Sequence, residues 1–162
     1  MAKDQLWRGG RITNLLSRFG HFRGRGIHSP FIYYVVRNVF LSRKLQHVTA
    51  PVFEQLTAIN LNSRTATELA NFAYHCEATT VAIDRNDDSA KMIICSTQCP
   101  DDTIEALFES AATNGTSIVI LTPYKRRALC NSLLKRHCCT SIDRFKYLAF
   151  LNNHLPKQHF KL

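Results

Sequence analysis

The chain has 162 residues with a formal net charge of +9, and 45% of them are hydrophobic and 20% charged. That composition is typical of a globular domain, and it excludes a chain that is disordered throughout and a collagen-like fibre. The longest apolar run is residues 31–36, far short of the roughly 20 residues that a membrane-spanning helix needs. We therefore expect no membrane span. We also expect no secretory signal, because the first residues lack an apolar stretch.

Charge falls into three blocks along the chain. Residues 1–47 carry nine Lys or Arg and one acid, residues 48–109 carry three and ten, and residues 110–162 carry nine and one. Such a pattern fits binding to nucleic acid or to a membrane surface, and it equally fits basic ends that pack against the acidic middle. We favour self-compensation, because the acidic block lies in the same chain.

Residues 1–50 are predicted to form a basic helical arm. Five of the six glycines lie in the first 26 residues, which are loop-like around a short amphipathic helix. Ser29 and Pro30 predict a helix start, because serine caps a helix and proline suits its first turn. This helix should run to about residue 45, and residues 47–51 predict a break before a second unit, residues 51–162.

From residue 56 the pattern alternates between strand and helix. Strands are predicted at residues 57–61, 80–83, 92–95 and 117–121, and one bent strand or two short ones at residues 140–152. Helices are predicted to begin at the capping-box patterns of Thr65 and Asp102, and to cover residues 124–137. Gly115 is predicted to end the second of these helices. The alternation favours an α/β fold with a Rossmann-like, doubly wound, mostly parallel sheet.

A nucleotide site in such a sheet lies beyond the carboxyl ends of the strands and usually needs glycines after the first strand. The predicted turn there contains Asn60, Asn62 and Ser63 and no glycine. We therefore expect no phosphate-binding loop. Asp84 follows the second predicted strand, where an acid can hold ribose hydroxyls, but we favour a solvated acid at a turn. These four residues are the candidate cofactor ligands if a cleft is retained.

Cysteine and histidine do not predict a metal site or a catalytic set. Cys95 and Cys99, and the run at residues 137–139, lack the paired spacing of zinc ligands. The residue order shows no nucleophile with its base. Without a secretory context, the six cysteines are expected to be free thiols in a reducing, cytoplasmic compartment.

Basic residues in two segments are candidates for contacts with nucleic acid or a protein partner. In the arm they lie among aromatic residues, and in the last predicted helix they are consecutive. The candidates are Arg11, Arg18, Arg23 and Arg25 in the arm, and Lys125, Arg126 and Arg127 in the helix.

Segments near the two ends of the chain resemble a known family. Residues 24–31 (GRGIHSPF), followed by an apolar helix, resemble the N-terminal region of a bacterial group of class I S-adenosylmethionine-dependent methyltransferase-like proteins. Residues 141–145 (SIDRF), 147–150 (YLAF) and 157–160 (KQHF) are similar to the last strands and tail of that group. The resemblance implies a Rossmann-like sheet and S-adenosylmethionine as the cofactor.

The chain departs from the family pattern at the functional positions. The resemblance implies an acid and glycines after the first strand, where this chain has residues 60–63 (NLNS). It implies a further helix and strand where only residues 85–91 stand, so one strand–helix unit is missing. Residues 95–98 (CSTQ) and 121–124 (LTPY) replace turns that carry the family's other polar motifs. Asp84 alone matches an expected acid.

These losses favour a shortened methyltransferase-like scaffold that binds no cofactor and acts as a structural or interaction protein. The first alternative is an active S-adenosylmethionine-dependent methyltransferase with an atypical cleft built from Asp84, Asn60 and Asn62. The second is a nucleic-acid-binding module that uses the basic arm. A homodimer is a possible cover for the sheet edge that the missing unit leaves.

Overall fold

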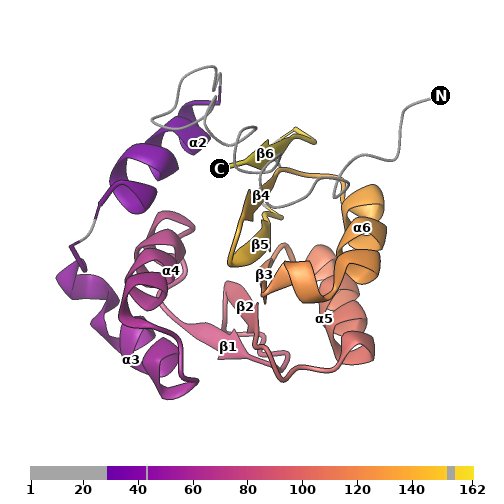
Figure 1. The fold of residues 1–162 in the computed structure, drawn as a ribbon, viewed down its shortest axis with the longest axis horizontal. Helices are drawn as coiled ribbons and strands as arrows, with labels where there is room; N and C mark the ends of the chain where they lie inside the picture. Colours follow the sequence, from indigo (N-terminus) through magenta and orange to yellow (C-terminus); the bar gives the residue numbers. More distant parts are fainter. Residues whose placement is uncertain (1–28, 43, 153–155) are drawn as a thin grey trace.

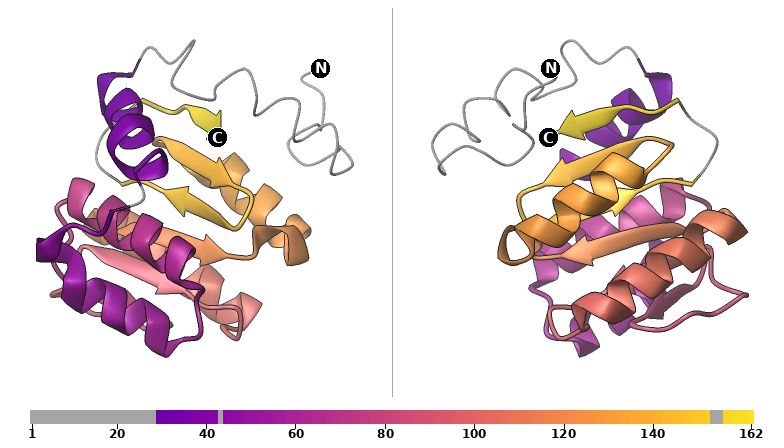
Figure 2. Two further views of the ribbon diagram at one scale, coloured as in Figure 1. Left: turned by 60° about the vertical axis from the view of Figure 1, so that its left-hand side comes forward. Right: turned by 90° about the vertical axis from the view of Figure 1, so that its right-hand side faces the viewer.

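The structure is a computed structural model and describes residues 29–42, 44–152 and 156–162. The candidates Arg11, Arg18, Arg23 and Arg25 lie outside these residues. Helices cover both faces of one sheet (Figures 1 and 2). One face carries α2 (Pro30–Val35), α3 (Ala50–Ala58) and α4 (Ser63–His75). The other face carries α5 (Asp101–Asn114) and α6 (Arg127–Arg136).

Six strands form the sheet in the described part of the chain, in the order β1-β2-β3-β5-β4-β6. In chain order they are β1 (Val81–Ile83), β2 (Met92–Cys95), β3 (Ser117–Leu121), β4 (Ser141–Arg144), β5 (Tyr147–Phe150) and β6 (His159–Lys161). Strands β1, β2 and β3 are parallel, β5 is antiparallel to both β3 and β4, and β6 is parallel to β4. The predicted α/β class is confirmed, and the sheet is mixed.

The predicted strand at residues 57–61 is wrong, because these residues end α3 and form the turn after it. Val52, Leu56 and Ile59 recur at helical spacing. The first two are buried, and the third packs against the same core. Pro51, expected at a break, stands in the first turn of α3, where no backbone N–H is required. Consequently β1, and not residues 57–61, is the first strand of the sheet.

The helix starts are only partly as predicted. Ser29 caps α2 as expected, with its Oγ accepting from the Ile32 N–H at 3.4 Å. The helix continues as the π-helical turn η2 (Val36–Phe40) and ends there, short of residue 45. Both predicted capping boxes are wrong. Asn62 caps α4, and α5 begins at Asp101 without a side-chain cap.

The predicted helix at residues 124–137 is two elements. The 3-10 turn η4 (Pro123–Lys125) comes first, and α6 begins at Arg127. The apolar residues Ala128, Leu129 and Leu133 predict the buried face of this helix. Leu133 is buried and Leu129 partly buried, but Ala128 is exposed. The strands predicted near residues 80–83, 92–95 and 117–121 are confirmed, and residues 140–152 hold two short strands.

The connection between β1 and β2 is unusually short. Parallel neighbours are commonly joined by a crossover of a dozen or more residues, which is often a helix. Here residues 84–91, all of them described, contain only turns, bends and irregular backbone. Because β1 has three residues, this short segment is long enough to return the chain to the start of β2.

The core has two apolar clusters, one on each face of the sheet. Ile32 and Val35 of α2 share the first cluster with Leu69 and Phe72 of α4. The described end of the predicted arm therefore packs into the same core as residues 51–162. All five residues of β3 are buried between the two helical layers, as its continuous apolar sequence predicts.

Three arginines of the basic C-terminal block pair with carboxylates of the acidic middle block. The pairs are Arg126 with Asp101, Arg136 with Glu105 and Glu109, and Arg144 with Glu68. This part of the charge pattern is thus compensated within the chain.

Gly115 ends α5 with a left-handed backbone, φ +70°. A Cβ there would meet only the Asn152 carbonyl oxygen at 3.7 Å, an ordinary contact. We expect Gly115→Ala to lower the free energy of unfolding by about 1 kcal/mol, through the backbone conformation alone. Gly115→Asn should cost less, because asparagine tolerates this conformation. Urea unfolding followed by circular dichroism measures both, and equal losses would contradict the explanation.

Candidate functional site

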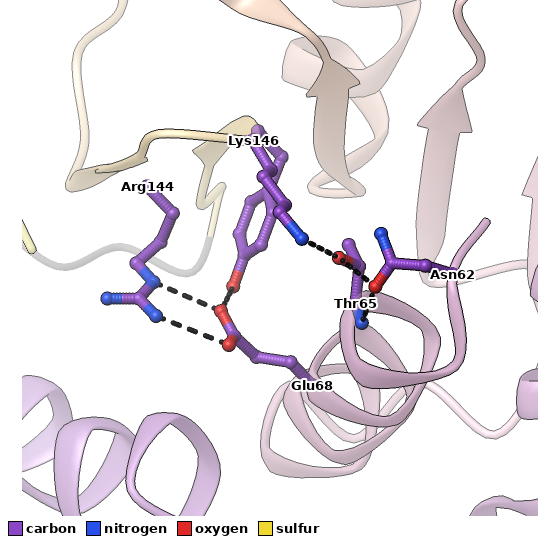
Figure 3. Close-up of polar contacts among 6 residues, drawn as sticks. Asn62, Thr65, Glu68, Arg144 and Lys146 are labelled. Carbon is purple, nitrogen blue, oxygen red and sulfur yellow. Dashed lines mark hydrogen bonds and ion pairs between the residues drawn. The ribbon is translucent and has the colours of Figure 1, made fainter. Parts of the chain in front are cut away.

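The carboxyl ends of β1, β2 and β3 form one edge of the sheet, which we call the carboxyl edge. The turn between β4 and β5 lies at the same edge, because the Thr122 N–H donates to the Lys146 carbonyl oxygen at 2.8 Å. The start of α4 joins it there, with Lys146 Nζ donating to Thr65 Oγ1 at 3.1 Å (Figure 3). The carboxyl edge is where a ligand of an open α/β sheet is expected.

Asn62 and Ser63 reach the carboxyl edge as the cap and first residue of α4, and not through a strand. Asn62 Oδ1 accepts from the backbone N–H of Thr65 at 3.0 Å and from its hydroxyl at 3.1 Å (Figure 3). Asn60 stands in the turn before them, with φ 61°. The amide oxygen of Asn62 is thus committed to the helix start.

Asp84 stands directly after β1, the first strand, and not after a second strand as predicted. Its Oδ1 accepts from the Ser96 N–H at 2.6 Å, and its own N–H donates to the Ile94 carbonyl oxygen at 3.1 Å. Its backbone is left-handed, φ 55°. The carboxylate therefore fastens the turn after β2 to the end of β1.

Arg126, directly before α6, connects the turn after β2 to the start of α5. Its side chain is 12% exposed, its Nη2 donates to the Thr97 carbonyl oxygen at 3.0 Å, and its Nε lies 3.4 Å from Asp101 Oδ1. Two buried polar atoms at this edge lack a hydrogen-bond partner within the described residues. They are Arg126 Nη1 and Thr122 Oγ1. Lys125 and Arg127, on either side of Arg126, are exposed.

Two buried thiols lie near Asp84. Burial and then the charge of Asp84 raise the pKa of Cys99 to about 11, and burial raises the pKa of Cys95 as well. Both thiols stay protonated at neutral pH and are poor nucleophiles. All six cysteines are free. In the part of the chain that the structure describes, no three His, Cys, Asp or Glu side chains come together as metal ligands would.

Glu68 connects α4 to the β4–β5 hairpin (Figure 3). Its two carboxylate oxygens accept from Arg144 Nε at 3.0 Å and Nη2 at 3.2 Å, and Tyr147 donates its hydroxyl at 2.7 Å. The Arg144 guanidinium also lies over the Phe40 ring, 4.5 Å from its centroid. Burial and the Glu68 charge raise the pKa of Tyr147 well above its ordinary value. The sequence does not predict this contact, because Glu68 fits the capping-box pattern that begins at Thr65.

Two hollows lie away from the carboxyl edge. One, of about 940 Å³, is lined by His75, Glu77 and Lys91 among others, at the amino ends of the parallel strands. The other, of about 380 Å³, is lined by residues that include His137 and Lys157. Neither contains a residue that the sequence predicts as a ligand.

Comparisons with family models, with curated proteins and with solved structures find no match to this chain. No helix of residues 29–42, 44–152 and 156–162 has the length and hydropathy to cross a bilayer, in line with the sequence. Of the predicted ligands, the structure brings Asn62, Ser63 and Asp84 to one edge of the sheet.

We expect Glu68→Gln to lower the free energy of unfolding by about 2 kcal/mol, because Arg144 then keeps a charge that nothing compensates. This figure lies below that of a fully buried pair, since the Arg144 side chain is 24% exposed. Tyr147→Phe is the matched variant: it removes one hydrogen bond and leaves the ion pair, for a loss of about 1 kcal/mol. Chemical denaturation measures both, and a smaller loss for Glu68→Gln would contradict the assignment.

His137 should make stability depend on pH. It is buried, its Nε2 lies 3.1 Å from the Thr140 carbonyl oxygen, and its ring packs on Phe108 and Phe150. Burial lowers the pKa of His137 most. The hydrogen bond with the Thr140 carbonyl oxygen raises this pKa, and the Lys157 charge lowers it. As the pH falls below about 6.5, the unfolded state therefore takes up a proton before the folded state does. The free energy of unfolding decreases below that pH and keeps its full value above it. The urea midpoint of His137→Gln, measured across this range, should change less than that of the unsubstituted chain, and equal changes would contradict the prediction.

Proposed function

We propose that the chain is a shortened, Rossmann-like methyltransferase-like domain that acts without cofactor chemistry, as a structural or interaction protein. The observation that carries the proposal is the internal use of polar groups at the carboxyl edge. The Asp84 carboxylate accepts from Ser96, the Asn62 amide oxygen caps α4, and Arg126 holds the Thr97 carbonyl. Groups that would hold a ribose or an amino acid are bonded to the chain itself.

The backbone after β1 supports the same proposal. A cofactor that approaches the first turn closely needs glycine there, since a side chain occupies the space. Residues 84–91 contain none. We also infer that the protein works in the reducing cytoplasm, where free thiols persist. The homodimer would add its partner at β1, an edge strand of the sheet.

An active methyltransferase with an atypical cleft is the second candidate. It is favoured by two observations at the same edge: Asp84 follows β1, and the buried Thr122 Oγ1 and Arg126 Nη1 have no hydrogen-bond partner among the described residues. In that case Asp84, Asn60, Asn62 and Ser63 would line the cleft and bind S-adenosylmethionine.

Thermal unfolding with S-adenosylmethionine and S-adenosylhomocysteine separates the two candidates. A ligand at 100 times its dissociation constant stabilises a protein by about 2.7 kcal/mol, which is several degrees for a domain of this size. We expect no shift at millimolar ligand in a chain that melts cooperatively. A shift of several degrees that is lost in Asp84→Ala and kept in Asp88→Ala would refute the proposal. Asp88 is the matched control, because it is an exposed acid of the same connection.

A further inference from the structure

Two exposed aromatic rings lie against each other at the carboxyl edge. Tyr124 belongs to η4, and Phe145 is the first residue of the β4–β5 turn. Their ring planes are 14° apart and their centroids are 5.6 Å apart, so the rings are stacked with an offset. Tyr124 is 38% exposed and Phe145 52%. Neither ring belongs to the two apolar clusters of the core, so core packing does not account for this pair.

The structure around the pair holds it in place. Thr122, two residues before Tyr124, is bonded through its N–H to the carbonyl oxygen of Lys146. On the other side, Arg144 is fixed to Glu68 and Lys146 to Thr65. The residues that flank both rings are therefore anchored to α4 and β3. A preorganised surface of this kind loses little conformational entropy on binding.

Cations surround the rings on both segments. Tyr124 is followed by Lys125 and Arg127, and Phe145 by Lys146, and all three cations are exposed. In the described part of the chain none of the three forms an ion pair, and Lys146 donates to the neutral Thr65 hydroxyl. The exposed acids of the carboxyl edge, Asp101 and Asp102, begin α5 beyond the end of β2.

We propose that this surface, the aromatic–basic platform of Tyr124, Phe145, Lys125, Arg127 and Lys146, binds single-stranded nucleic acid. Flat rings accept bases by stacking, and nearby cations without carboxylate partners accept the phosphate backbone. The platform favours this partner over a lipid surface, because its apolar part is one stacked pair of rings and not the long apolar face of an amphipathic helix. The proposal is independent of whether the chain binds S-adenosylmethionine.

Fluorescence anisotropy of the full chain with labelled oligothymidylate and oligouridylate tests the platform. Probes of about 15 nucleotides cover the common site sizes. We expect Phe145→Leu to weaken binding at least about fivefold, the lower limit for loss of one stacked base. Tyr34→Leu is the matched control, because it removes an exposed ring (63%) from α2 and should have no effect. Comparison of the two probes shows whether DNA or RNA is preferred.

The charges are tested through the dependence of affinity on salt. Replacing both Lys125 and Arg127 with Gln should reduce the slope of log affinity against log salt by about 1.4, for two lost phosphate contacts on a single strand. Lys91→Gln, an exposed lysine at the opposite edge, should leave the slope unchanged. The substituted side chains are exposed, so thermal melts of all variants should match that of the unsubstituted chain.

Four outcomes would overturn the proposal. If the chain binds neither oligonucleotide at low salt, the proposal is refuted. If all platform variants bind as the unsubstituted chain does, the site lies at other basic residues. Equal loss in Phe145→Leu and Tyr34→Leu would remove the role of stacking. Binding to vesicles with anionic lipid but to neither oligonucleotide would make the surface a membrane contact.

Discussion

The antiparallel pairing of β5 with β3 determines what stands at the carboxyl edge. All five residues of β3 are buried, and β3 joins the parallel strands on one side to the hairpin on the other. Because β5 runs against β3, the turn that precedes β5 must lie beside the carboxyl end of β3. The hairpin thus delivers Arg144, Phe145 and Lys146 to the edge where an open α/β sheet places its ligand.

In our proposals this arrangement connects the absence of a cofactor site to the presence of a binding surface. Arg144 and Tyr147 bond to Glu68, and Lys146 bonds to Thr65, so the hairpin and the start of α4 hold each other. Their polar groups are satisfied within the chain, and Phe145 is left at the turn with its ring toward Tyr124. In our proposals the same contacts explain why the edge is closed to a small cofactor and why its rim is rigid.

The sequence predicts an element correctly where its apolar periodicity and the residues that begin or end it indicate the same kind of structure. The continuous apolar run of β3 is visible in the sequence, as is the stop at Gly115. Residues 57–61 were misassigned because a short apolar run fits a strand and a helix end equally well. Glu68 fits the capping-box pattern, but Asn62, three residues before Thr65, caps the helix. Glu68 instead pairs with Arg144, which is distant in the sequence. Contacts such as Tyr124 with Phe145 depend on strand pairing, which local pattern does not contain.

The charge pattern fits both internal compensation and binding, and in the structure some of the basic residues are paired with acids while others are exposed without an ion pair among the described residues. Arginines whose partners lie on neighbouring elements are paired, as Arg136 is with Glu105 and Glu109. Lys125 and Arg127 flank Arg126, yet Arg126 alone of the three lies 88% buried beside an acid. Lys125 ends η4, Arg126 lies between the two helical elements and Arg127 begins α6. Only the Arg126 side chain enters the edge, and its two neighbours are exposed. Pairing therefore takes up the buried Arg126 at this edge and leaves the exposed Lys125 and Arg127 beside the aromatic pair, where in our proposal charge and stacking act on the same partner.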